Sequence, residues 1–208
     1  TSWINALLAE QNATTGAFSA NANDHAWAML TLRAAGALDP GKEKLAAEYL
    51  LSCEFVPSEG GFKDSWEYAS LDVTGVVAMA LAGWEDDPDL GASVSAIRAY
   101  LTSQQSNDGG YGSFGTVNGS TTSYVVNGLA ALGADPFTVV TEASLTPIES
   151  LLSFQNPDGS FFYPESDWNP DGTGEGTVDP ITTKQAPQAL WSAINGTTAR
   201  GSAYNIIL

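Results

Sequence analysis

Apolar side chains recur along the chain at the spacing of a helix face. Leu45, Tyr49 and Leu50 are separated by four- and one-residue steps, which places them on one side of a helix. Similar leucine-rich stretches predict four helices, and Asp-Pro pairs precede the last three. An aspartate cap followed by proline is a start signal, because the carboxylate accepts from free N–H groups and proline lacks a donor that the first turn leaves unused. The four predicted helices cover residues 1–10, 42–52, 91–103 and 145–154.

A second kind of predicted helix is small and apolar. Its four copies are each followed by a glycine, the usual residue just past a helix end, and they cover residues 25–35, 72–82, 122–132 and 185–195. Their alanine and glycine content indicates close packing on several sides. We therefore expect these helices inside the fold and the leucine-rich helices outside. Pro187 should lie in the first turn of the last one or kink it.

A short sequence motif, called the phrase, links the two kinds of helix and occurs four times. It consists of a leucine, three residues, a Gln or Glu, a short spacer and then Gly-x-aromatic. Successive Gln or Glu positions are 43, 51 and 50 residues apart, a period typical of a chain built from one repeated unit. We interpret the phrase as structural, since glycine permits a sharp turn and the aromatic ring anchors it by burial. The copies are Leu7, Gln11, Gly16 and Phe18; Leu50, Glu54, Gly60 and Phe62; Leu101, Gln105, Gly109 and Tyr111; and Leu151, Gln155, Gly159 and Phe161.

This phrase resembles the QW repeat of triterpene cyclases and the related repeat of protein prenyltransferase β subunits. The resemblance implies an all-α fold, the α/α toroid, in which outer helices ring inner helices around a central cavity. The same toroid occurs in cobalamin carriers, in complement thioester domains and in non-catalytic bacterial cell-surface proteins. Two departures stand out: the aromatic is Phe or Tyr and never the Trp typical of the cyclases, and four hairpins are fewer than usually close the ring.

The resemblance therefore predicts one domain, residues 1–196, that forms a partial toroid of about four helical hairpins. Residues 197–208 are expected to be a tail or the start of a following segment. The edges of such an arc would pack on another domain or chain. Thr1 is not an initiator residue, so we expect a piece of a longer precursor. The resemblance to surface proteins implies an extracellular or cell-surface location.

The charge balance narrows the choice of partners. Seven basic residues against 24 acidic ones give a net charge of −17, whereas phosphate and anionic-lipid binding depend on clustered Lys and Arg. Nucleic acid and anionic membrane surfaces are therefore disfavoured. No run of about 20 apolar residues predicts a membrane span. The expected partners are a small molecule, an extracellular protein, or other domains of the parent chain.

The chemistry of the enzymatic relatives requires motifs that the chain lacks. Cyclases of the hopene type protonate substrate with an Asp-x-Asp-Asp acid, and the nearest cluster here, residues 85–89, lies in a linker. Prenyltransferases hold zinc with Asp, Cys and His, but Cys53 and His25 are the only Cys and His and belong to different elements. The thioester motif is also absent. Enzymatic activity is disfavoured, although a cyclase-like enzyme using Asp72 or Asp24 as its acid remains an alternative.

Aromatic and polar residues near the starts of the inner helices form the predicted ligand site. The loops after the Gly-x-aromatic phrase vary most between units and should gather at one rim, where repeat folds often place recognition. A structural seal at the end of the barrel is the alternative. The rim and cavity residues are Asp24, His25, Trp27, Trp66, Tyr68, Asp72, Phe114, Thr122, Tyr124, Tyr163 and Trp168.

The longest loop carries the first half of a calcium-binding pattern. Asp167, Asn169 and Asp171 precede a glycine, with Thr173 and Glu175 at the next two ligand positions. Val178 stands where an EF-hand has a bidentate Glu, so a complete EF-hand is not expected. The pattern predicts either calcium in a lone loop or an acidic, glycine-rich turn.

These observations favour a non-catalytic module that binds a small ligand in the toroid cavity or a protein at its loop rim. A corrinoid is one ligand that the resemblance to cobalamin carriers implies. The alternatives are the cyclase-like enzyme and a structural spacer within a long surface chain.

Overall fold

The computed structural model of the protein describes residues 2–53, 55–56, 58–64, 68–113, 115–138, 145–164 and 174–195. This part of the chain is mostly helical, which confirms the predicted class, and contains eight helices and five short strands. None of these helices has the length and apolar character that crossing a membrane requires.

The two predicted kinds of helix alternate along the chain. The leucine-rich helices are α1 (Ser2–Glu10), α3 (Pro40–Ser52), α5 (Gly91–Ser103) and α7 (Pro147–Leu152). The small, apolar helices are α2 (Ala22–Ala34), α4 (Leu71–Leu81), α6 (Gly119–Ala131) and α8 (Pro180–Asn195). Helices α4 and α6 are the most completely buried of the eight.

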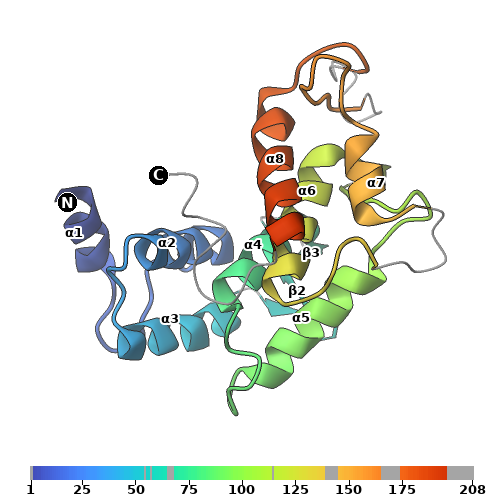
Figure 1. Ribbon diagram of the computed structural model, residues 1–208. Coiled ribbons are helices and arrows are strands. Elements are labelled where there is room, and N and C mark those ends of the chain that lie inside the picture. The colour runs from blue at the N-terminus through green and yellow to red at the C-terminus, as the bar shows by residue number, and fades with distance from the viewer. Residues whose placement is uncertain are drawn as a thin grey trace.

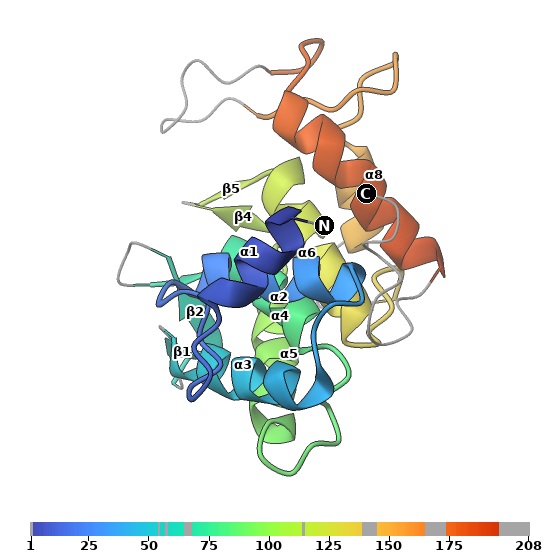
Figure 2. The same ribbon diagram turned by 90° about the vertical axis from the view of Figure 1, so that its left-hand side faces the viewer.

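The small, apolar helices pack in chain order. Helix α2 contacts α4, α4 contacts α6, and α6 contacts α8, while α3, α5 and α7 pack along this row. Figure 1 shows α4 between the first helices and the α6–α8 group, and the second view places α8 at the far end from α3 (Figure 2). The larger core fills the space around α4, and a smaller one lies between α6, α7 and α8.

Helices α4 and α6 approach closely because two glycines face each other. A Cβ on Gly75 would lie 2.6 Å from the carbonyl oxygen of Tyr124, and a Cβ on Gly128 would lie 2.9 Å from the carbonyl oxygen of Gly75. Both obstacles are backbone atoms, which cannot rotate away. Glycine at these two positions therefore sets the spacing between the central helices.

The Asp-Pro start signals are confirmed at α3 and wrong at α5 and α7. Asp39 caps α3 by accepting from the N–H groups of Gly41 and Lys42, with Pro40 as the first helical residue. Asp87 accepts instead from Asp89 and Leu90, which forms a turn before α5 begins at Gly91. Asp135 accepts from the Phe137 N–H in a turn, and Thr146 caps α7 instead. A proline that follows an aspartate fits a turn as well as a first helical turn, so the signal does not fix the register.

In each repeat, a side chain near the start of the small, apolar helix hydrogen-bonds to the backbone of the aromatic residue in the preceding phrase. The backbone N–H of that aromatic donates to this side chain in every repeat, and the distances are 2.9–3.1 Å. The pairs are Phe18 with His25 Nδ1, Phe62 with Thr74 Oγ1, Tyr111 with Thr122 Oγ1, and Phe161 with Thr183 Oγ1. This contact fixes each turn to the start of the following helix.

Short strands extend the phrase in two repeats and were not predicted. Strand β2 (Gly61–Lys63) pairs with β1 (Phe55–Val56) and β3 (Ala69–Ser70), and β4 (Gly112–Ser113) pairs with β5 (Thr116–Val117). The first repeat has only three residues between Phe18 and α2, too few for the chain to fold back. The longer segments of the next two repeats satisfy their backbone groups by pairing.

Candidate functional site

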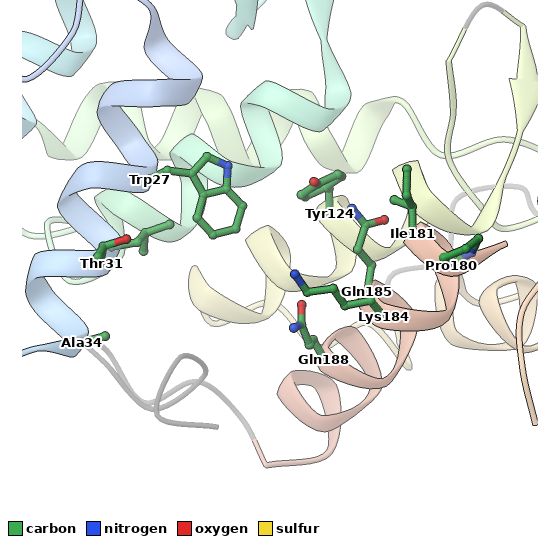
Figure 3. Close-up of a pocket in the computed structure, with 10 residues that line it drawn as sticks. Trp27, Thr31, Ala34, Tyr124, Pro180, Ile181, Lys184, Gln185 and Gln188 are labelled. Atoms are coloured by element: carbon green, nitrogen blue, oxygen red, sulfur yellow. The ribbon is translucent and has the colours of Figure 1, made fainter. Parts of the chain in front are cut away.

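A hollow of about 370 Å³ lies between α2 and α8, with α6 at its floor. Trp27, Leu30, Thr31 and Ala34 line it from α2, and their spacing of three and four residues places them on one face of that helix. Tyr124 contributes from α6. Figure 3 shows the residues of α2 on one side of the space and those of α6 and α8 on the other.

The α8 side of the hollow is more polar than the α2 side. It is lined by Ile181, Lys184, Gln185 and Gln188, again at steps of three and four residues, together with Pro180. The side chains of Lys184 and Gln188 extend into the space that faces Trp27 (Figure 3). The hollow thus combines an apolar, aromatic wall with one ammonium and two amides.

Lys184 is available for a ligand in the described part of the chain. The ion pairs found there involve Arg33 with Glu43, and Lys44 with three carboxylates, but not Lys184. Its neighbour Gln185 is held in place, because the Ser120 hydroxyl donates to Gln185 Oε1 over 2.6 Å. Lys184 thus has no carboxylate partner among these ion pairs of the described residues, and the next residue of α8 is an ordered amide.

Tyr124 lines both the hollow and a second, polar space. We call this second space the rim space, because it is lined by residues predicted to lie at the rim. Burial raises the pKa of its hydroxyl, the charge of Asp72 adds to the rise, and a hydrogen bond with Gln185 opposes it. The polar rim space, of about 440 Å³, is lined by Tyr124 with Asp24, Asp64 and Asp72 among others. Tyr68 and Asp72 line a further rim space of about 330 Å³.

The structure brings several predicted site residues together. Trp27 and Tyr124 line the hollow, and Asp24, Asp72 and Tyr124 line the adjoining rim space. Tyr68 is 76% exposed at the other side of Asp72. These five residues therefore line three neighbouring spaces, which share Tyr124 and Asp72.

Two predicted site residues have structural contacts instead. His25 is fully buried: its Nδ1 accepts from the Phe18 N–H, so its Nε2–H donates to the Ala46 carbonyl at 2.9 Å. Burial lowers the pKa of His25, which favours this neutral form. Thr122 is buried too, and its hydroxyl accepts from the Tyr111 N–H and donates to the Tyr111 carbonyl.

The remaining predicted residues do not add to the hollow. The carbonyl of Tyr163 accepts from the Gly174 N–H in the loop before α8. Glu175 is exposed, and the described residues contain no cluster of three His, Cys, Asp or Glu side chains suited to a metal. The other predicted positions lie outside the described residues: Trp66, Phe114 and Trp168 of the rim, and Asp167, Asn169, Asp171 and Thr173 of the calcium pattern.

Sequence reasoning missed the α8 wall because it started this helix too late. The helix begins at Pro180, five residues before the predicted start, and Asp179 Oδ2 accepts from the Thr182 N–H at 2.7 Å. Pro187 consequently lies within the helix and not in its first turn. Asp179-Pro180 is the same start signal that located α3, so the sequence did contain the information.

Asp72 is the least satisfied carboxyl group near the site. It lies in the first turn of α4, and its Oδ1 is shielded from solvent without a hydrogen-bond partner. Burial raises the pKa of Asp72, a hydrogen bond with the Thr121 side chain opposes the rise, and the charge of Asp64 adds to it. Its ionised form therefore opposes folding.

Asp72→Asn is expected to raise the free energy of unfolding at pH 7 by about 1 kcal/mol, because an uncharged amide avoids the buried charge. The unfolded carboxyl ionises near pH 3.8 and the folded one at higher pH, so the wild-type penalty grows between these two pKa values and is constant above the folded one. Below pH 3.8 both carboxyls are neutral and the two proteins should be equally stable. Urea unfolding across pH measures this difference. Asp24→Asn is the control: Asp24 is exposed in the first turn of α2, and its removal should give no gain.

Comparison with known proteins gives no assignment for this chain. No protein-family model matches it, and no curated protein matches it either. The arrangement of side chains around the hollow is therefore the basis on which a function can be proposed.

Proposed function

We propose that the protein is a non-catalytic binding module whose ligand is small, largely apolar and singly anionic. The observation that carries this proposal is the hollow between α2 and α8, with Trp27 and Tyr124 on its walls and Lys184 at its polar side. Ligand sites in proteins are typically apolar concavities with a few convergent polar groups. A volume of about 370 Å³ suits a ligand with two or three rings.

The proposal includes the fold family. We infer that the helices form part of an α/α toroid, with α2, α4, α6 and α8 as the inner helices and the hollow on the concave side. The alternation of the two helix kinds and the chain-order packing of the inner row support this. The repeat phrase supports a relation to the non-catalytic bacterial surface members of that superfamily, and with it an extracellular or cell-surface location.

The anionic group follows from the charges around the site. The chain carries 24 acidic residues and only seven basic ones, yet the side chain that extends into the hollow is Lys184. An exposed ammonium attracts an anion modestly in water, by about 1 kcal/mol. The apolar wall, which Trp27 dominates, would supply the larger share of affinity through burial of the ligand's rings.

A cyclase-like enzyme fits the same geometry less well. The acid with a raised pKa, Asp72, lines the rim spaces and does not line the hollow. A substrate in the hollow would have Tyr124 between its rings and this carboxyl. A spacer role would leave the hollow without a function.

The test is a fluorescence titration with 1-anilinonaphthalene-8-sulfonate, which has an aromatic body and one sulfonate. We expect saturable binding that weakens about fivefold, or about 1 kcal/mol, in Lys184→Gln. Binding should be lost in Ala34→Trp, which fills the hollow from α2. Trp3→Ala is the matched control, since Trp3 is an exposed aromatic of α1 away from the hollow, and it should bind as the wild type does. Equal binding by all four proteins would overturn the proposal.

A further inference from the structure

The phrase glycine of each repeat is a packing site for the next outer helix. The space beside Gly16 is occupied by the backbone of Leu45 in α3, and a Cβ on Gly60 would lie 2.9 Å from the Ala96 carbonyl oxygen in α5. The space beside Gly109 is occupied by Leu145, just before α7. The same interface between repeats therefore occurs three times.

The fourth phrase glycine has no such neighbour. No atom lies within 4 Å of a Cβ placed on Gly159, its own chain neighbours aside, although its φ of 89° matches that of the other three. In the part of the chain that the structure describes, the turn at Gly159 thus has the same backbone conformation as the other three turns, but no following helix packs against it. We call this surface the α7–α8 edge.

Helix α8, which follows this turn, has an exposed apolar face. Thr182, Ala186 and Ala189 are buried on its packed side. Pro187, Trp191 and Ile194 lie on the opposite side, because each residue advances by about 100° around a helix. Ile194 is 71% exposed and Pro187 is exposed too. These three residues are apolar, and the exposed Lys184 borders them at the edge of the hollow.

The first repeat offers a complementary edge. Helix α1 has no buried residue, and its Trp3 is 52% exposed. The residues that pack against Gly16 and Gly60 are Leu45 of α3 and Ala96 of α5, and each lies five positions before the leucine of its own phrase. The corresponding position on α1 is Ser2, next to Trp3. The start of α1 is therefore the equivalent of the segments that occupy Gly16 and Gly60.

Helices α8 and α1 carry little negative charge. Helix α8 has no acidic residue in its 16 positions, and α1 has one, Glu10, at its end. In a chain with a net charge of −17, a contact made through α1 and α8 avoids much of the repulsion between two copies, although Asp158 directly precedes Gly159 and Glu149 belongs to α7. Depletion of charge is also what distinguishes the centre of protein interfaces.

We propose that the α1 edge of one copy of this chain docks on the α7–α8 edge of a second copy. The contact places Ser2 and Trp3 beside Gly159, and Trp191 and Ile194 beside the helices of the incoming first repeat. It continues the interface that already joins the repeats within one chain. Because the two surfaces differ, the contact is head-to-tail and can extend to further copies or close into a ring.

The test is sedimentation velocity of the wild type and of variants that carry a charge on one edge only. The wild-type mass should rise above 21.7 kDa with concentration, at protein concentrations on the order of 100 μM. Trp3→Glu and Ile194→Glu should each remain monomeric. An equimolar mixture of these two variants should form a 1:1 complex and nothing larger, because each variant keeps one intact and different edge.

Phe137→Glu is the matched control, since Phe137 is 44% exposed and belongs to none of α1, α7 and α8, and it should assemble as the wild type does. A wild type that stays monomeric at every concentration would overturn the proposal. So would a wild-type dimer combined with no complex in the variant mixture, because a symmetric contact needs the same edge from both copies. Circular dichroism of each variant separates these outcomes from a loss of folding.

Discussion

Gly75→Val should lower the free energy of unfolding by about 3 kcal/mol, the upper range for overpacking a tight core. A side chain there would meet the carbonyl of Tyr124, whose position is fixed by the backbone of α6. Relief requires α4 and α6 to separate, which breaks the packing of the two most buried helices. Urea unfolding monitored by circular dichroism measures the change.

Gly75→Ala tests the same contact between α4 and α6 with a smaller side chain. Helix propensity favours alanine over glycine by about 1 kcal/mol, so a destabilised variant can only reflect the contact with α6. Gly41→Ala in α3 is the control, since its Cβ would meet only a side-chain oxygen of Asp39 at 3.3 Å. A Gly75→Ala protein as stable as the wild type would mean that the central helices lie farther apart than the structure places them. Tyr124 also lines the hollow, so the valine variant should bind the sulfonate probe more weakly.

The number and kinds of helices could be predicted from the sequence because the signals were local. Leucine spacing, the Asp39-Pro40 cap and the glycine after each inner helix depend only on residues within a few positions. The repeat reinforced them, since each signal occurs about every 50 residues. The same locality explains the error at α5, where Asp87-Pro88 forms a turn and not a cap.

The contacts that hold each phrase in place could not be predicted. Thr74 and Thr183 bind phrase residues that lie 12 and 22 positions earlier, and His25 performs the same role over seven. Such a variable separation leaves no period in the sequence. His25 was therefore predicted as a rim residue, when its side chain substitutes for a threonine in the first repeat.

The candidate site was predicted in part. Trp27 and Tyr124 were identified as aromatic residues at inner-helix starts, and they do line the hollow. Lys184 was missed because the predicted helix began at residue 185, which left out the first turn whose spacing joins Lys184 to Ile181 and Gln188. The burial of Asp72 depends on residues far from it in the sequence, such as Thr121 of α6, and no pattern within α4 indicates it.

Arg33→Met should destabilise the protein by about 3 kcal/mol, because it leaves the Glu43 carboxylate without its partner in a buried position. The guanidinium joins three helices: its Nε and a terminal nitrogen lie 2.8 Å from Glu43 Oε1 of α3, and it donates to the carbonyls of Met79 and Ala80 at the end of α4. Both side chains are 9% exposed. Lys44→Met is the control, since Lys44 is 34% exposed and its ion pairs should contribute less than about 1 kcal/mol.

The double variant Arg33→Met, Glu43→Leu separates the two parts of this effect. Removing the second charge eliminates the buried carboxylate, so the double variant should recover most of the loss if the ion pair dominates. If it recovers nothing, the lost bonds to the Met79 and Ala80 carbonyls account for the effect, and Arg33 acts chiefly as a cap on α4. Either result concerns the hollow as well, because Arg33 fixes α2, which carries Trp27, to α4.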